Sequence, residues 1–211
     1  MIVKDEEKVI ARCLDSVKDL VDEIIIVDTG STDKTKEIVS QYTNKIYDFE
    51  WCNDFSKARN FSFSKATKDY IMWLDADDVI EPNDREKFRM LRDKIDGTVD
   101  VYMLKYNYHL DKNGKPTLIQ VRERIVKREK QFQWVSPIHE VIIPQGNIEE
   151  IDIAITHHKI ETKNPRRNIE IFEEMKKNNV EFDVRQEYCY AKELYYLHEY
   201  DKAIRTIYVF H

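Results

Sequence analysis

The sequence predicts an α/β protein with a mostly parallel sheet and helices on both faces, then an antiparallel part, then a helical tail. Three changes of pattern along the 211 residues support this prediction. Up to Gly97, short apolar runs alternate with stretches of helical periodicity, as in a doubly wound parallel sheet. Residues 99–155 are rich in β-branched and aromatic residues separated by turn signals. From Asn164 onward, apolar residues recur at helical spacing.

The parallel part is expected to begin inside a strand at residues 1–3, and a helix follows. The buried face of this helix is marked by a stripe of four apolar residues: Ile10, Cys13, Leu14 and Val17. The continuous apolar run at 23–27 predicts a second strand that is covered on both faces. After a turn that Gly30 permits, we expect a helix around residues 38–42 and a third strand at 45–47.

The next strand is predicted at residues 70–74, after a helix that Asn53 or Asp54 caps. This strand ends in three carboxylates, and a further helix begins near Asn83. The carboxylates are Asp75, Asp77 and Asp78.

Asp75 and Asp77 are two residues apart, so in extended chain they project to the same side, just past the end of the strand. Open α/β sheets bind their ligands at this edge. Two carboxylates in one site repel each other unless a cation lies between them, and hard oxygen ligands favour Mg²⁺ or Mn²⁺. The alternative interpretation is a cluster that caps a helix N-terminus. The short Asp-x-Asp pattern does not decide between the two.

The antiparallel part is expected to contain a hairpin at the Asn113–Gly114 pair, which favours a two-residue turn. Its strands are predicted at 99–108, 117–121, 124–126, 134–143 and 151–155. The helical tail is similar to a tetratricopeptide repeat, of which about one unit of roughly 34 residues fits into the chain. We therefore predict one domain at 1–160 and the start of a repeat region at 161–211.

The composition excludes several classes of protein. A net charge of −6 argues against a nucleic-acid partner, which normally requires a basic surface. The three cysteines lack metal-ligand spacing, which indicates a reducing compartment without structural zinc. No apolar run is long enough for a transmembrane segment. The expected location is the cytoplasm, with peripheral contact at the inner face of the membrane as the alternative.

Five motifs together resemble family 2 glycosyltransferases of the GT-A type, and more narrowly their bacterial members with tetratricopeptide repeats after the catalytic domain. They are Met1-Ile-Val-Lys-Asp-Glu6, Val27-Asp-Thr-Gly-Ser-Thr-Asp33, Asn53-Asp-Phe-Ser-Lys-Ala-Arg-Asn60, Trp73-Leu-Asp-Ala-Asp-Asp78 and Ile138-His-Glu140. Each motif is weak alone, but all five occur in the order of the family. The resemblance implies a GT-A-type, Rossmann-like catalytic domain.

The resemblance also implies a site for a nucleotide-sugar donor, which is expected to be a UDP-sugar. Asp28 would hold the base, and Glu6 would lie near the nucleoside. Asp75 would hold the ribose or the donor sugar, with Arg59 and Asn60 supporting the pocket. From the residues alone, Asp28 also fits a turn in which its side chain binds the backbone.

The metal implied by the resemblance is Mn²⁺ or Mg²⁺, bound by Asp77 and His157. The family commonly shows a His-x-Gly-Tyr run where this chain has His157-His-Lys-Ile160, so His158 is an alternative ligand. The reaction implied is a single displacement with inversion, in which a carboxylate takes the proton of the acceptor. We expect Glu140 to be this base, with Asp78 as the second choice.

His139 is expected to orient Glu140 or to act as the base itself, because its unperturbed pKa lies nearest neutrality. The acceptor is predicted to be a saccharide, a lipid-linked glycan, or a peptide or protein. The helical tail is expected to serve acceptor recognition or to form a homodimer.

Two other functions fit parts of the sequence. A nucleotidyltransferase also uses carboxylates and Mg²⁺ on an α/β sheet, but the glycine- and lysine-rich phosphate loop of such enzymes is absent. A non-catalytic scaffold would bind a protein through the tyrosine-rich tail. The leading prediction is a metal-dependent hexosyltransferase.

Overall fold

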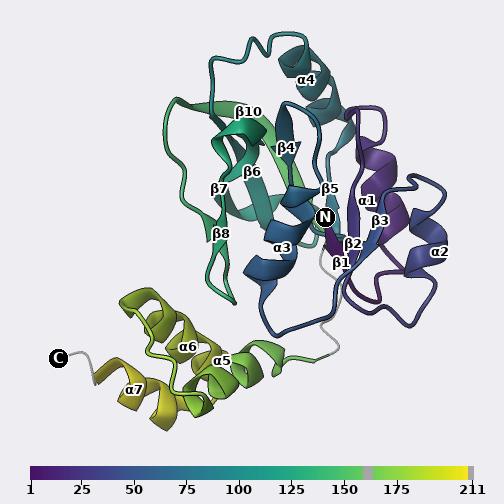
Figure 1. Ribbon diagram of the computed structural model, residues 1–211. Coiled ribbons are helices and arrows are strands. Elements are labelled where there is room, and N and C mark those ends of the chain that lie inside the picture. The colour runs from purple at the N-terminus through teal and green to yellow at the C-terminus, as the bar shows by residue number, and fades with distance from the viewer. Residues whose placement is uncertain (159–163, 209–211) are drawn as a thin grey trace. The chain divides into compact units, whose positions relative to one another are not determined.

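A computed structural model describes residues 1–158 and 164–208 of the chain (Figure 1). The chain divides into two units, each considered separately below. The first unit comprises Met1–Trp51, Lys57–Trp134 and Ile142–Ile160. The second unit contains the C-terminal helices together with two short segments, Cys52–Ser56 and Val135–Val141. The predicted domain boundary at residue 160 lies outside the described residues, so the division at this residue stays a prediction.

The parallel strands of the first unit form a three-stranded sheet in the order β1-β2-β3. These strands are β1 (Ile2–Val3), β2 (Ile26–Asp28) and β3 (Ile46–Asp48). The second strand begins three residues later than predicted, because β1 and β3 pair with it only at Ile26–Asp28. Helices α1 (Ile10–Val17) and α2 (Thr35–Val39) lie on one side of this sheet, as Figure 1 shows.

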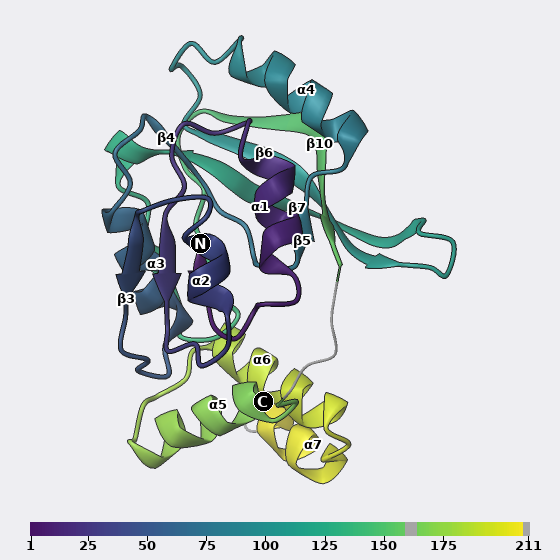
Figure 2. The same ribbon diagram turned by 90° about the vertical axis from the view of Figure 1, so that its right-hand side faces the viewer.

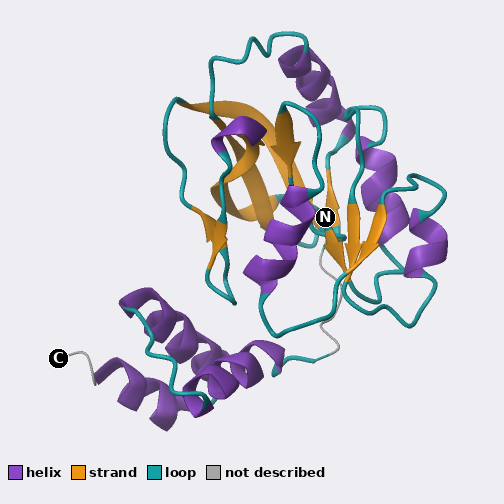
Figure 3. Ribbon diagram, in the orientation of Figure 1, coloured by secondary structure: helices purple, strands orange, loops and turns teal. Residues whose placement is uncertain are grey.

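A second sheet of five strands has the order β4-β7-β6-β10-β5. The strands are β4 (Tyr70–Met72), β5 (Asp78–Val79), β6 (Val101–Leu110), β7 (Pro116–Lys127) and β10 (Ile148–His157). Neighbouring strands are antiparallel except for β6 and β10, which run parallel. The parallel part of the fold is therefore smaller than predicted, because β4 pairs antiparallel with β7. Both sheets are drawn in orange in Figure 3.

The β6–β7 hairpin projects beyond the rest of the second sheet (Figure 2). Its connection is longer than the predicted two residues, because the last strand pair is Leu110 with Pro116. The Asp111 side chain accepts hydrogen bonds from the backbone N–H groups of Asn113 and Lys115, at 2.8 and 2.9 Å. The turn is therefore set mainly by Asp111 rather than by the Asn-Gly pair. The two strands predicted at 117–121 and 124–126 are one continuous strand.

The strand predicted at 134–143 is largely wrong. Only β8 (Trp134–Val135) and β9 (Val141–Ile142) are extended, and they form a two-stranded sheet. The residues between them, 136–140, form a loop in which Ser136 and His139 have positive φ angles of 74° and 52°. This conformation is incompatible with a strand. We call residues 136–140 the Glu140 loop.

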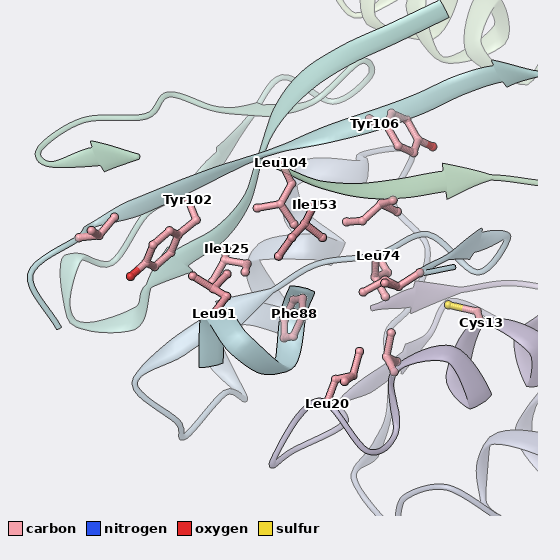
Figure 4. Close-up of a cluster of buried hydrophobic side chains, with 14 residues drawn as sticks. Cys13, Leu20, Leu74, Phe88, Leu91, Tyr102, Leu104, Tyr106, Ile125 and Ile153 are labelled. Carbon is pink, nitrogen blue, oxygen red and sulfur yellow. The ribbon is translucent and has the colours of Figure 1, made fainter. Parts of the chain in front are cut away.

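The main hydrophobic core lies between the second sheet and helices α1 and α4 (Pro82–Arg92). Leu104 and Ile153 of the sheet point toward Phe88 and Leu91 of α4 in Figure 4. Helix α4 begins with Pro82, whose missing N–H costs nothing in the first turn. A further helix, α3 (Phe55–Ser64), precedes β4.

The second unit contains three helices: α5 (Arg167–Lys177), α6 (Val184–Tyr196) and α7 (Tyr200–Tyr208). Phe172 of α5 packs against Tyr190 of α6, with ring centroids 5.6 Å apart. The helical nature of this region matches the prediction, while its assignment to tetratricopeptide repeats stays a prediction. None of the described helices is long and apolar enough to cross a bilayer.

The turn before β10 is predicted to require a glycine at position 146. Its φ is +85°, and an added Cβ would lie 2.2 Å from Oδ2 of Asp100, the oxygen that accepts the N–H of Asn147. We expect Gly146→Ala to lower the free energy of unfolding by about 1.5 kcal/mol more than Gly114→Ala, because it also costs a hydrogen bond to a charged group. Gly114 has a similar φ of +79° but open space around it, so it is the matched control. Equal losses of unfolding free energy for the two variants in urea denaturation would contradict a steric conflict at Gly146.

Candidate functional site

Three potential metal ligands meet where β5 pairs with β10. This pairing places His157 opposite Asp78, and Asp77 directly precedes β5. Nδ1 of His157 lies 3.3 Å from Oδ1 of Asp77 and 3.5 Å from Oδ1 of Asp78. Each of the three residues offers a ligand atom within 4.8 Å of the others. Among the predicted site residues, the fold therefore brings Asp77, Asp78 and His157 together.

The donor set of this cluster fits a divalent cation. Carboxylate oxygens suit Mg²⁺ and Mn²⁺, and imidazole is accepted by transition metals. Burial lowers the pKa of His157, but its contacts with Asp77 and Asp78 outweigh burial and raise the pKa to about 9. Without a cation, His157 is therefore protonated near neutral pH and faces both carboxylates. Binding of a metal would have to displace this proton.

His158 points to different neighbours. Its Nε2 lies 2.8 Å from Oε1 of Glu81, and its backbone N–H donates to the carbonyl of Asp77. The cluster contains His157 rather than its neighbour. This arrangement favours His157 as the metal ligand.

Asp78 lies in the protein core with no exposed side-chain area. Its Oδ2 accepts from Nη1 of Arg124 at 2.9 Å and from the backbone N–H of Asp75 at 3.0 Å. Its Oδ1 accepts from the hydroxyl of Tyr106 at 2.9 Å. These bonds fix the acidic loop, residues 75–78, from within. A carboxylate buried and bonded in this way cannot reach an acceptor hydroxyl. The position of Asp78 therefore argues against Asp78 as the base.

No sequence pattern predicted a role for Arg124. It is nevertheless the largest fully buried side chain among the described residues. Its guanidinium lies between the rings of Trp73 and Tyr106, 3.7 and 4.1 Å from their centroids. Nε and Nη2 have no hydrogen-bond partner in the described structure, so the faces of the two rings supply their electrostatic contact. Burial, followed by the charges of Asp78 and Asp75, raises the pKa of Tyr106, which keeps its hydroxyl protonated as a donor.

Asp75 forms an ion pair with Arg59, and the donor-binding roles that the family resemblance implies for the two residues stay predictions. Nη2 of Arg59 donates to Oδ1 of Asp75 at 2.7 Å, and the rings of Trp73 and Trp134 flank the guanidinium. Burial raises the pKa of Asp75, but the charges of Arg59 and Arg124 outweigh it and lower the pKa to about 2. Asp75 is thus ionised, and its side chain is 37% exposed.

Asn60 has a different partner from its neighbour Arg59. Its side chain bonds the backbone of Trp134 twice, through Nδ2 to the carbonyl at 3.0 Å and through Oδ1 to the N–H at 2.8 Å. Asn60 therefore joins α3 to β8. The structure shows no contact between Asn60 and the acidic loop among the described residues.

Asp28 is the last residue of β2, and its two carboxylate oxygens differ in their hydrogen bonding. Oδ1 accepts from the backbone N–H groups of Gly30 and Ser31 at 2.9 and 2.8 Å, which is the turn expected from the sequence alone. Oδ2 is buried and has no partner among the described residues. A buried acceptor in this state can take a hydrogen bond from a ligand N–H. Glu6 lies at the start of α1, where its carbonyl accepts from Val9 and Ile10.

His139 and Glu140 belong to the second unit. Nε2 of His139 lies 2.7 Å from Oε1 of Glu193 on α6, so the imidazole is engaged by the helix. The roles predicted for His139 and Glu140 stay predictions.

Comparison with known proteins identifies the family of the chain. Residues 1–147 match the family described as Glycosyl transferase family 2, and because the match covers more than half of the chain, the chain belongs to this family. The SPbeta prophage-derived glycosyltransferase SunS of Bacillus subtilis (strain 168) is 28% identical over 222 residues, or 97% of this chain and 50% of SunS. The chain thus spans half the length of this curated relative.

Two solved structures have the same fold. The structure of S. aureus TarS 1–349 in complex with UDP-GlcNAc has a TM-score of 0.55 at 18% identity, covering 92% of this chain and 70% of that one. Glucosyl-3-phosphoglycerate synthase from Mycobacterium tuberculosis in complex with Mn²⁺ and UDP-glucose has a TM-score of 0.54 at 14% identity, covering 86% and 78%. At these identities the likeness concerns the fold alone, and it confirms the predicted GT-A type.

Removing Arg124 should strongly destabilise the protein. We expect Arg124→Met to lower the free energy of unfolding by about 3–5 kcal/mol, because Asp78 would remain buried without its ion-pair partner. Arg89→Met is the matched control, since Arg89 pairs with Asp19 at 2.6 Å on the surface, and such pairs contribute about 0–1 kcal/mol. Denaturant titration of both variants measures the difference. Similar losses would show that the buried pair is dispensable.

Proposed function

We propose that the chain is the catalytic part of an inverting, metal-dependent glycosyltransferase that uses a nucleotide-sugar, most simply a UDP-sugar. The observation that carries this proposal is the cluster of Asp77, Asp78 and His157 beside the ionised Asp75. Membership of glycosyl transferase family 2 supports it. So do the UDP-GlcNAc and the UDP-glucose with Mn²⁺ that the two structural neighbours bind.

In this proposal each residue has a role in holding the donor. Asp77 and His157 hold the cation, which when bound neutralises the charge that develops on the leaving diphosphate. Oδ2 of Asp28 accepts a hydrogen bond from an N–H of the base. Asp75, fixed by Arg59, accepts hydrogen bonds from hydroxyl groups of the ribose or of the sugar.

Glu140 acts as the general base. Its carboxylate takes the proton of the acceptor hydroxyl while the acceptor oxygen bonds to the anomeric carbon and the bond to the diphosphate breaks. The new bond forms on the face opposite the leaving group, so the configuration inverts. The acceptor is proposed to be a saccharide, a lipid-linked glycan, or a peptide or protein.

The first test concerns the cation. We expect Asp77→Ala and His157→Ala each to reduce the Mn²⁺-dependent affinity for UDP by about tenfold or more, because a ligand to the metal is lost. His158→Ala is the matched control and should keep wild-type affinity, since His158 contacts Glu81 instead. Calorimetric titration of UDP with and without Mn²⁺ measures the effect. A folded wild-type protein that binds only nucleoside triphosphates would favour a nucleotidyltransferase.

The second test separates chemistry from donor binding. Glu140→Gln should bind Mn²⁺ and UDP as the wild type does, yet hydrolyse UDP-sugar about 10²–10⁴-fold more slowly, because the amide cannot accept the proton. Release of UDP from a panel of UDP-sugars, with water as acceptor, measures the rate. Glu150→Gln, an exposed change on β10, is the control. Wild-type hydrolysis by Glu140→Gln would remove Glu140 from the mechanism.

A further inference from the structure

The Glu140 loop groups with the C-terminal helices, although they lie further along the sequence. The second unit groups Val135–Val141 with α5, α6 and α7. Cys52–Ser56 belongs to the same unit, and the backbone N–H of Phe55 donates to the carbonyl of Pro137 at 2.9 Å. The residue proposed as the base is thus part of the helical unit.

The loop needs external support, because its backbone is strained. Ser136 and His139 both have positive φ, which costs a residue with a side chain on the order of 1 kcal/mol or more. Such conformations persist only when surrounding contacts determine them. The loop has no glycine to relieve the cost, since it reads Ser136-Pro-Ile-His-Glu140.

Helix α6 contacts both strained residues through one side chain. The guanidinium of Arg185 donates to the backbone carbonyl of His139 and, at 3.3 Å, to Oγ of Ser136. Arg185 therefore spans the two positions where the backbone is strained.

A second contact from α6 holds the ring of His139. Oε1 of Glu193 lies 2.7 Å from Nε2 of His139 and accepts from Nδ2 of Asn168, on α5, at 2.9 Å. The side chain of Glu193 is 13% exposed. Burial raises the pKa of Glu193, but the hydrogen bonds from His139 and Asn168 outweigh it and lower the pKa. The carboxylate is therefore charged and satisfied in this position.

We propose that Arg185 and Glu193 are positioning residues for catalysis: helix α6 sets the backbone of the Glu140 loop and thereby the direction of the base. The catalytic half of this inference rests on the function proposed above. The contacts that carry this inference all lie within the second unit.

Amide hydrogen exchange tests whether Arg185 and Glu193 hold the Glu140 loop, and it requires no enzymatic activity. In Arg185→Met and Glu193→Ala, amide exchange in residues 135–141 should accelerate by about tenfold. Local opening of the loop costs less free energy once its contact with α6 is lost. Glu193→Gln should stay near the wild type, since its amide oxygen still accepts from His139. Glu187→Ala is the matched control: Glu187 lies on the same helix and pairs with Lys176 of α5 at 3.3 Å. Unchanged exchange in Arg185→Met and Glu193→Ala, or equal acceleration in Glu187→Ala, would overturn the proposal.

Kinetics tests the catalytic consequence. Arg185→Met and Glu193→Ala should lower kcat for UDP-sugar hydrolysis by about 10- to 100-fold, because a misplaced base loses its alignment. Their Mn²⁺-dependent affinity for UDP should stay unchanged. Faster exchange with an unchanged kcat would overturn the positioning role. A wild-type protein without hydrolysis would instead overturn the proposed function, and the exchange experiment would still decide whether α6 holds the loop.

Discussion

The buried ion pair between Arg124 and Asp78 is the interaction on which the acidic loop depends. Removing two charges from water is costly, and it succeeds here because both oxygens of Asp78 are bonded and two aromatic rings cover the guanidinium. One of those bonds reaches the backbone of Asp75. The core thereby fixes the conformation of the loop, while the side chains of Asp75 and Asp77 stay partly exposed.

Local sequence rules predicted the acidic part of the site well. A short apolar strand followed by three carboxylates, and a helix that carries Arg59, lie where the pattern placed them. The same rules did not distinguish Arg124 from Arg122. Both flank Glu123 on β7, and both guanidiniums lie over the ring of Trp73, 5.3 and 3.7 Å from its centroid. The pairing of β7 with β6 is irregular here, since Tyr102 pairs with Ile125 and Met103 with Glu123, and no local pattern predicts this irregularity. The parallel pairing of β6 with β10 is equally a long-range choice that no local pattern encodes.

The Glu140 loop was mistaken for a strand for a related reason. Trp134, Ile138 and Ile142 are apolar and buried, which is consistent with extended chain. The positive φ angles fall on Ser136 and His139 rather than on glycines, so the local signal against a strand is Pro137, which has no N–H to donate to a neighbouring strand. The side chains that contact the two strained residues are Arg185 and Glu193, about 50 residues further along the chain. A prediction from the local sequence could not include them.

The position of His157 affects when the proposed metal site can form during synthesis. Its partners Asp77 and Asp78 leave the ribosome some 80 residues before β10 is available to pair with β5. A cation therefore cannot serve as an early nucleus for folding of this unit. A bound cation would instead stabilise the folded unit against unfolding, because its ligands come together only after β10 has been added.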